Sequence, residues 1–151
     1  MSDNRQCSRF VFHHMAMAVD DVEASTRAMG VLCFSLDPTM PDAVEQRYGV
    51  RLRFLMVAAQ QLMLELVAPI RSDSVISDLL IQRGVGLYHC CFEVPSLDMA
   101  VEELERNGFR KVGQALRATA FGGRPIQFMH SPAAGLVELL EAVPRSVGSQ
   151  P

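Results

Sequence analysis

Apolar runs separated by glycine, proline and capping residues predict short strands and three helices along this chain. Asp20 or Asp21, and Ser96, are suited to begin helices, while Gly84 and Gly108 are suited to end them. Alternating or continuously apolar runs predict strands. The expected helices cover residues 21–30, 74–83 and 97–108, and the expected strands cover 9–19, 31–36, 50–57, 61–68, 86–94, 109–115, 125–130 and 136–142.

The second half of this pattern repeats the first, as two βαβββ units. The two units are predicted at about residues 9–69 and 84–143, within one α+β domain at residues 9–145 with tails at 1–8 and 144–151. Residues 37–48 and 119–124 are expected to be loops. Polar and aromatic residues recur as well, which a shared strand pattern alone does not explain. The offsets are 75 residues from His14 to His89, 74 from Phe54 to Phe128 and 73 from Glu65 to Glu138.

Each half places one histidine and one glutamate in the middle of an apolar strand. Because strand side chains alternate between faces, His14, Glu65, His89 and Glu138 are each expected on the buried face of their strand. A buried unpaired carboxylate costs several kcal/mol, and a divalent cation shared with two imidazoles relieves that cost. The repeated pair therefore predicts a metal site for Co, Mn, Zn, Ni or Fe, although a lone strand histidine is more often a hydrogen-bonded core residue.

Neighbouring residues allow several roles around this site. His13 is expected on the face opposite His14 if the strand is regular, whereas Gln61 shares a face with Glu65 and could support it. Cys91 shares a face with His89, so it lines the pocket or serves as a small buried apolar residue. Arg124 is a candidate for binding a substrate phosphate, in a glycine-containing segment that otherwise reads as a turn.

The composition and charge of the chain argue against nucleic-acid-binding and membrane-spanning proteins. The chain has 151 residues, a formal charge of −3 and an isoelectric point near 5.8, with no basic run, so no nucleic-acid partner is expected. No apolar run has the length of a signal peptide core or a membrane span. The four cysteines show no CxxC spacing and suit a reducing compartment. We therefore expect a cytoplasmic protein without membrane segments.

The chain resembles the vicinal oxygen chelate, or glyoxalase/bleomycin resistance/dioxygenase, superfamily, and within it the methylmalonyl-CoA epimerases. Four segments that span nearly the whole chain carry the resemblance: HHMAMAVDD at 13–21, LELVAP at 64–69, DSVISDLLIQRGVGLYHCCFEV at 73–94 and FGGRPIQFMHSPAAGLVELLEA at 121–142. The resemblance implies a cup-shaped curved sheet in which His14, Glu65, His89 and Glu138 hold one divalent metal ion.

The resemblance also implies an isomerase, an epimerase of an acyl-CoA or similar dicarbonyl substrate. Glu138 would be both a metal ligand and one proton-transfer base, and Asp42 or Glu45 in the 37–48 loop would be the other base. Such chemistry suits a carbon between two carbonyl groups, because the metal withdraws charge as the proton leaves.

Two other functions remain open at this point. A bleomycin-resistance type of binding protein uses the same cup without metal, and it generally lacks the four ligands present here. Another superfamily enzyme, such as a lyase, a glutathione-dependent isomerase or a tailoring enzyme, is also compatible. The open sheet edges favour a homodimer, with the two units paired either within one chain or between chains.

Overall fold

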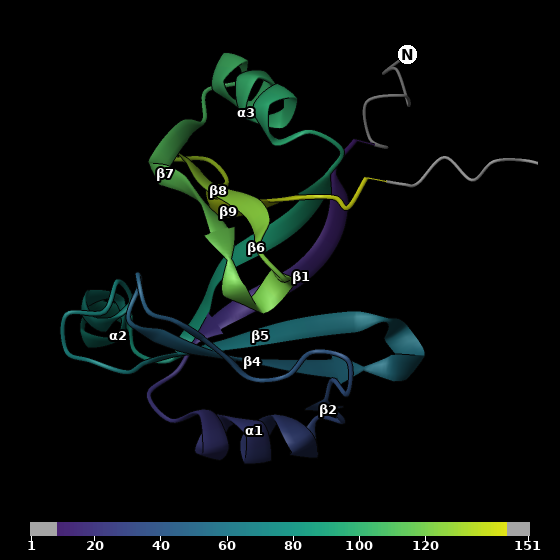
Figure 1. The fold of residues 1–151 in the computed structure, drawn as a ribbon. Coiled ribbons are helices and arrows are strands. Elements are labelled where there is room, and N and C mark those ends of the chain that lie inside the picture. The colour runs from purple at the N-terminus through teal and green to yellow at the C-terminus, as the bar shows by residue number, and fades with distance from the viewer. Residues whose placement is uncertain (1–8, 145–151) are drawn as a thin grey trace, which may run out of the picture.

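In the computed structural model, which describes residues 9–144, nine strands form one curved sheet with three helices against it (Figure 1). The strand order is β2-β4-β5-β1-β6-β9-β8-β7, and β3 pairs with β4. The strands are β1 (Val11–Ala18), β2 (Ser35–Leu36), β3 (Ala43–Glu45), β4 (Val50–Val57), β5 (Leu62–Pro69), β6 (Gly86–Val94), β7 (Arg110–Ala118), β8 (Arg124–Ser131) and β9 (Gly135–Glu141). The helices are α1 (Val22–Val31), α2 (Ser77–Arg83) and α3 (Leu97–Arg106).

The two predicted βαβββ units are joined within this one chain. β1 pairs with β5 in parallel in the first half, and β6 pairs with β9 in parallel in the second. β1 and β6 then pair antiparallel at the centre of the sheet. The α+β fold with a curved sheet is confirmed, and the units pair inside the chain.

Local capping explains the helix boundaries. The Asp21 carboxylate accepts hydrogen bonds from the backbone N–H groups of Glu23 and Ala24, at 2.8 and 3.1 Å. The Ser96 hydroxyl accepts one from Met99 N–H at the start of α3. Gly84 follows α2 with φ of 73°, a backbone conformation that favours glycine. Asp21, Ser96 and Gly84 are thus the caps that the sequence predicted, whereas α2 begins at Ser77 instead of residue 74 and α3 ends at Arg106 instead of residue 108.

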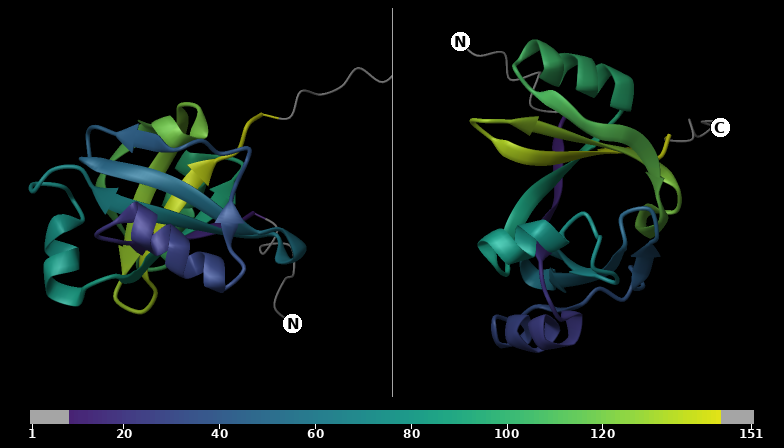
Figure 2. Two further views of the ribbon diagram at one scale, coloured as in Figure 1. Left: turned by 90° about the horizontal axis from the view of Figure 1, so that it is seen from below. Right: turned by 90° about the vertical axis from the view of Figure 1, so that its left-hand side faces the viewer.

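Helices α1 and α3 cover the outer faces of the two halves, so that the inner faces look toward each other (Figure 2). Helix α1 packs Val22 against β4 and β5, and α3 packs Leu97, Ala100 and Val101 against β8 and β9. Burial of these apolar side chains is the main force that holds each helix on its sheet. A third apolar cluster lies between the halves: Phe54, Cys91, Ala118, Phe121, Ile126 and Leu140.

The predictions for the two segments between α1 and β4 were wrong. Only Ser35–Leu36 of the predicted strand at 31–36 is a strand, and it pairs with the end of β4. The segment 37–48 is not a loop throughout, because Ala43–Glu45 forms β3. β3 exists because it pairs with Val50, Arg51 and Leu52 at the edge of β4, a tertiary contact that overrides local turn signals.

Some expectations fall outside the described residues. The predicted tail at 1–8, all of the predicted tail at 144–151 except Pro144, and Cys7 lie there. Within residues 9–144, every helix is too short or too polar to cross a bilayer.

Candidate metal centre

Four adjacent strands at the centre of the sheet supply the four predicted ligands. His14 lies on β1, Glu65 on β5, His89 on β6 and Glu138 on β9. The register brings them together through two small residues: Ala16 stands between Glu65 and His89, while Cys91 stands between His14 and Glu138. Because the side chains of Ala16 and Cys91 are short, the longer side chains of the four predicted ligands can meet on the inner face of the curved sheet.

The four ligand atoms form one buried cluster. All four residues are at least 95% buried, and one ligand atom from each lies within 4.8 Å of the others. His14 Nε2 is 3.3 Å from Glu65 Oε2 and 3.8 Å from Glu138 Oε2, while His89 Nε2 is 2.9 Å from Glu138 Oε2 and 3.7 Å from Glu65 Oε2. Donor atoms about 2.1 Å from one ion stand about 3.0–3.4 Å apart, so the cluster fits a metal ion.

Hydrogen bonding does not satisfy the cluster by itself. Nε2 of His14 and Nε2 of His89 are buried without a well-directed hydrogen-bond partner. Buried polar atoms in folded proteins are nearly always partnered, and an ion is one of the usual reasons for an exception. The four side chains therefore form a possible metal site.

The electrostatics of the cluster favour a positive charge at its centre. Burial alone would lower the pKa of His14, but the Glu65 and Glu138 carboxylates outweigh burial and raise it. Burial likewise would raise the pKa of Glu65, but the His14 and His89 imidazoles hold it below its usual range. Both shifts mean that a positive charge beside the Glu65 carboxylate is favourable, and either a protonated His14 imidazole or a metal ion would supply it.

A phenylalanine ring packs against each of the two histidines, His14 and His89. Phe54 pairs with Glu65 across the β4–β5 hairpin and lies 5.9 Å from the His14 ring, centre to centre. Phe128 pairs with Glu138 across β8–β9 and lies 5.2 Å from the His89 ring. The repeated phenylalanine noticed in the sequence is thus the hairpin partner of each glutamate. Each phenylalanine packs against one histidine of the cluster and so restricts the rotamers of that histidine.

A cavity of about 460 Å³ opens beside the cluster. Glu65, His89 and Glu138 form part of its wall, and most other lining residues are apolar. Tyr48 and Tyr88 add two phenol groups to that wall. A concave, mainly apolar cavity with a few charged groups is typical of small-molecule sites.

Glu45 lines this cavity from β3. Its Oε2 accepts hydrogen bonds from the Thr119 hydroxyl at 2.9 Å and from Thr119 N–H at 3.3 Å. Thr119 belongs to a 3₁₀ turn, Thr119–Phe121, of the second half. The second half therefore orients a carboxylate of the first, a contact that no sequence signal indicated.

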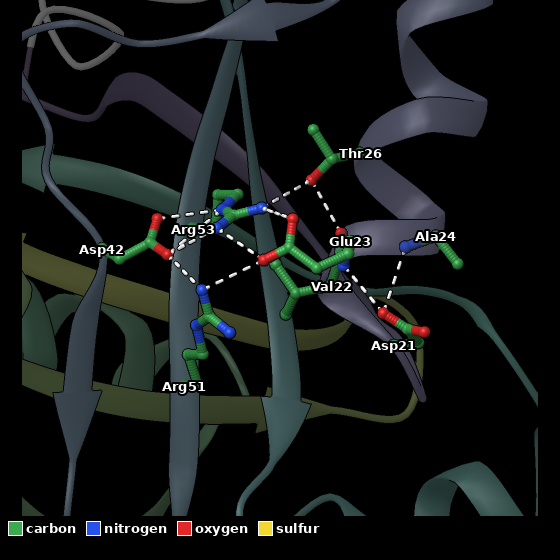
Figure 3. A network of polar contacts seen from close by, with 8 residues as sticks. All are labelled: Asp21, Val22, Glu23, Ala24, Thr26, Asp42, Arg51 and Arg53. Atoms are coloured by element: carbon green, nitrogen blue, oxygen red, sulfur yellow. Dashed lines mark hydrogen bonds and ion pairs between the residues drawn. The ribbon is translucent and has the colours of Figure 1, made fainter.

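Asp42 lies outside the lining of the cavity, in a surface network of charges (Figure 3). Its carboxylate accepts hydrogen bonds from Arg51 at 2.6 Å and from Arg53 at 2.7 Å, and Arg53 also binds Glu23 of α1. Hydrogen bonds from Arg53 and Arg51 hold the pKa of Asp42 below its usual range. These hydrogen bonds connect Asp42, the residue before β3, to β4 and α1.

The other predicted contact residues are held elsewhere. Gln61 is exposed, in the turn before β5, with a left-handed φ of 51°. Arg124 forms an ion pair with Glu93 and donates a hydrogen bond to the Glu141 carbonyl, so its guanidinium is already engaged. Cys91 is fully buried beneath the cluster, and burial raises the pKa of its thiol. None of these three residues is part of the cavity wall.

His13 does not point away from His14, so that expectation was wrong. The pairing of β1 with β6 slips between Phe12 and His14, which makes His13 an extra residue in a β-bulge. Nδ1 of His13 lies 2.8 Å from Nδ1 of His14, and its ring packs edge-on against Phe121. Burial, and then the nearby His14, lower the pKa of His13 to about 4, so this ring is neutral at pH 7.

The family model described as "Glyoxalase/Bleomycin resistance protein/Dioxygenase superfamily" matches residues 13–128. The chain belongs to this superfamily, as its curved sheet of two βαβββ units and its central His–Glu cluster indicate.

Its similarity within the superfamily is to methylmalonyl-CoA epimerases. The mitochondrial methylmalonyl-CoA epimerase of Mus musculus is 31% identical over 134 residues, covering 86% of this chain and 72% of the relative. The ethylmalonyl-CoA/methylmalonyl-CoA epimerase of Cereibacter sphaeroides is 28% identical over 119 residues, covering 78% and 86%. The crystal structure of the Mycobacterium tuberculosis methylmalonyl-CoA epimerase superposes with a TM-score of 0.76 at 28% identity, covering 89% of each chain.

Proposed function

We propose that this protein is a metal-dependent epimerase of methylmalonyl-CoA type, which inverts a carbon that lies between two carbonyl groups. The observation that carries the proposal is the buried cluster of two imidazoles and two carboxylates, three members of which, Glu65, His89 and Glu138, line an apolar cavity. The similarity to epimerases that act on short branched malonyl thioesters supports the choice of an acyl-CoA substrate.

The four ligands would hold one divalent ion by His14 Nε2, His89 Nε2 and one oxygen each of Glu65 and Glu138. Bound there, the ion would act as a Lewis acid on substrate carbonyl oxygens and stabilise the negative charge that develops when the α-proton leaves. Imidazole nitrogens together with carboxylates suit Co, Mn, Zn, Ni or Fe.

Two carboxylates that line the cavity are our candidates for moving the proton. An epimerase needs one group to remove the α-proton from one face of the carbon and another to return a proton to the opposite face. Glu45 enters from the first half and Glu138 from the second, and both line the same cavity. Asp42, the alternative to Glu45, is bound to Arg51 and Arg53 outside it. We therefore assign the two roles to Glu45 and Glu138.

The surrounding apolar residues support the chemistry by excluding water. Val67, Leu52, Ile126 and Phe128 lie in the wall around the carboxylates. In such a dry environment a carboxylate is a stronger base, and the charge of a bound ion is less screened.

The four buried ligands also argue against a metal-free binding protein, because a cavity that bound only an apolar ligand would not retain two buried carboxylates.

Proton exchange tests the proposal. The protein loaded with Co²⁺ or Mn²⁺ is incubated with racemic methylmalonyl-CoA in deuterated buffer, and α-deuterium is measured by mass spectrometry. We expect deuteration that depends on the metal and falls to background in the Glu138→Gln variant. Metal-loaded wild-type protein that leaves the α-position protonated would contradict this function.

Assembly and location are proposed separately. The prediction of a homodimer rests on the open edges of the sheet at β2 and β7. Light scattering after size-exclusion chromatography should give twice the mass of the 16.7 kDa chain. A cytoplasmic location also stays a prediction, which cell fractionation would test.

A further inference from the structure

The two histidines of the candidate metal centre, His14 and His89, differ in the hydrogen-bond partner of their Nδ1 atom. Nδ1 of His14 lies 2.8 Å from Nδ1 of His13. Nδ1 of His89 is buried and has no hydrogen-bond partner. The residue before His89, at the position that repeats His13, is Tyr88, whose ring lies edge-on to His89 at 4.6 Å. The first half therefore carries a contact that its copy lacks.

A hydrogen bond between two Nδ1 atoms requires a proton on one of them and none on the other. An imidazole that binds an ion through Nε2 must carry its proton on Nδ1. Nε2 of His14 faces Glu65 and Glu138, so an ion bound there would leave the His14 proton on Nδ1, from which it would be donated to His13. His13 can accept only through an unprotonated Nδ1, which places its own proton on Nε2.

We propose that His13 is a positioning residue for the metal centre: it accepts a hydrogen bond from His14 Nδ1–H and so holds His14 in the tautomer and orientation that present Nε2 to the ion. The proposal rests on the metal-dependent function proposed above. Carboxylates, backbone carbonyls and waters usually serve as the hydrogen-bond partner of a metal-binding histidine, and here a second imidazole takes that place.

The backbone supplies the reason that two consecutive histidines can meet. In a regular strand, neighbouring side chains point to opposite faces. The extra residue of the β-bulge in β1 turns His13 back toward the face that His14 occupies. Phe121 then packs against both rings, at 5.5 Å from His13 and 5.7 Å from His14. The pair is thus held by a bulge on one side and an aromatic ring on the other.

Nitrogen-15 NMR of histidine-labelled protein tests the proton positions directly. In the Zn²⁺-loaded protein at pH 7, we expect His14 protonated on Nδ1 and His13 protonated on Nε2 only. A His13 ring with its proton on Nδ1, or with both nitrogens protonated, would overturn the proposal. So would two bound ions per chain, because a second ion between His13, His14 and Cys91 would take the Nδ1 atoms as ligands.

Metal affinity tests the consequence with three variants, measured by competition with a chromogenic chelator. His13→Phe removes the acceptor but keeps a ring beside Phe121, and we expect about a tenfold or greater loss of Zn²⁺ or Co²⁺ affinity. His13→Asn restores an acceptor near the position of Nδ1 and should recover most of it. His130→Phe, at an exposed histidine of β8, is the matched control and should bind as the wild type does.

The outcomes separate the two proposals. Wild-type affinity in His13→Phe, or a loss in His13→Asn as large as in His13→Phe, would overturn the positioning role while leaving the metal centre intact. A wild-type protein that binds no ion would overturn the metal centre itself and the positioning role with it. If His13→Phe does not fold, the NMR tautomers and His13→Asn still decide the question.

Discussion

Glu45 on β3 accepts a 2.9 Å hydrogen bond from the hydroxyl of Thr119, which lies 74 residues further along the chain. The bond crosses from one βαβββ unit to the other and fixes a carboxylate in the cavity wall. Closure of the two units on each other therefore does more than bring together the four proposed metal ligands. It also orients Glu45 in the cavity wall, where we propose that it is the second proton-transfer carboxylate.

Glu45→Gln and Asp42→Asn form a matched pair that tests which loop carboxylate moves the proton. We expect Glu45→Gln to lower kcat for epimerisation by about 10²–10⁴-fold, the usual contribution of a general base. Asp42→Asn should change kcat by less than about tenfold, since Asp42 lies outside the cavity wall. Both are measured by chiral analysis of the product, and the reverse order of effects would reassign the base to Asp42.

The Asp42 network should contribute to stability rather than chemistry, in a manner that depends on pH. The pKa of Asp42 is lowered in the folded protein, so its contribution is fully present above its ordinary value of 3.8 and is lost as pH falls through the lower folded value. Because the network is partly exposed, Asp42→Asn should reduce the unfolding free energy by no more than about 1 kcal/mol at pH 7.

Urea unfolding at pH 7 and at pH 3 measures that difference. The gap between wild type and Asp42→Asn should shrink at the lower pH and in high salt. A gap that stays constant across pH would show that the carboxylate charge is not what stabilises this segment.

Much of this site was predictable because strand periodicity fixes which side chains share a face. His14, Glu65, His89 and Glu138 each stand on the buried face of an apolar strand, and their repeated spacing predicted that they converge. The phenylalanines that precede the two glutamates were visible in the same way, and they are their hairpin partners.

Other parts of the site leave little or no mark in the sequence. The bulge that turns His13 toward His14 adds one residue to a strand whose apolar pattern looks regular. β3 is three residues long and forms through pairing with β4. Local residue types, which include proline and charged residues, predicted a loop there because they carry no information about that pairing. The bond from Thr119 to Glu45 depends on how two distant units close, which local patterns do not encode.

Phe54 should be a main determinant of stability near the centre. Its side chain is 1% exposed and packs against the rings of His14 and Phe121. We expect Phe54→Ala to cost about 3–5 kcal/mol in urea unfolding, from lost burial and the cavity left behind. Phe12→Ala, at a phenylalanine that is 45% exposed, is the matched control and should cost about 1 kcal/mol. Equal losses would contradict the packing described.

Binding of a divalent ion should stabilise the folded protein. At a free metal concentration 100 times the dissociation constant, the gain is about 2.7 kcal/mol, which for a chain of this size raises Tm by about 5–10 °C. Differential scanning calorimetry with Co²⁺ and with excess chelator measures the shift. His89→Ala should lose the metal-dependent shift, whereas His130→Ala should keep it.

The central claim is that one histidine and one glutamate from each unit bind a single ion. X-ray absorption spectroscopy of the Co²⁺-loaded protein, at one equivalent of metal, tests it most directly. We predict two imidazole ligands together with oxygen donors in the wild type, and one imidazole fewer in both His14→Ala and His89→Ala. A spectrum with oxygen donors alone, or one that neither substitution changes, would contradict the account.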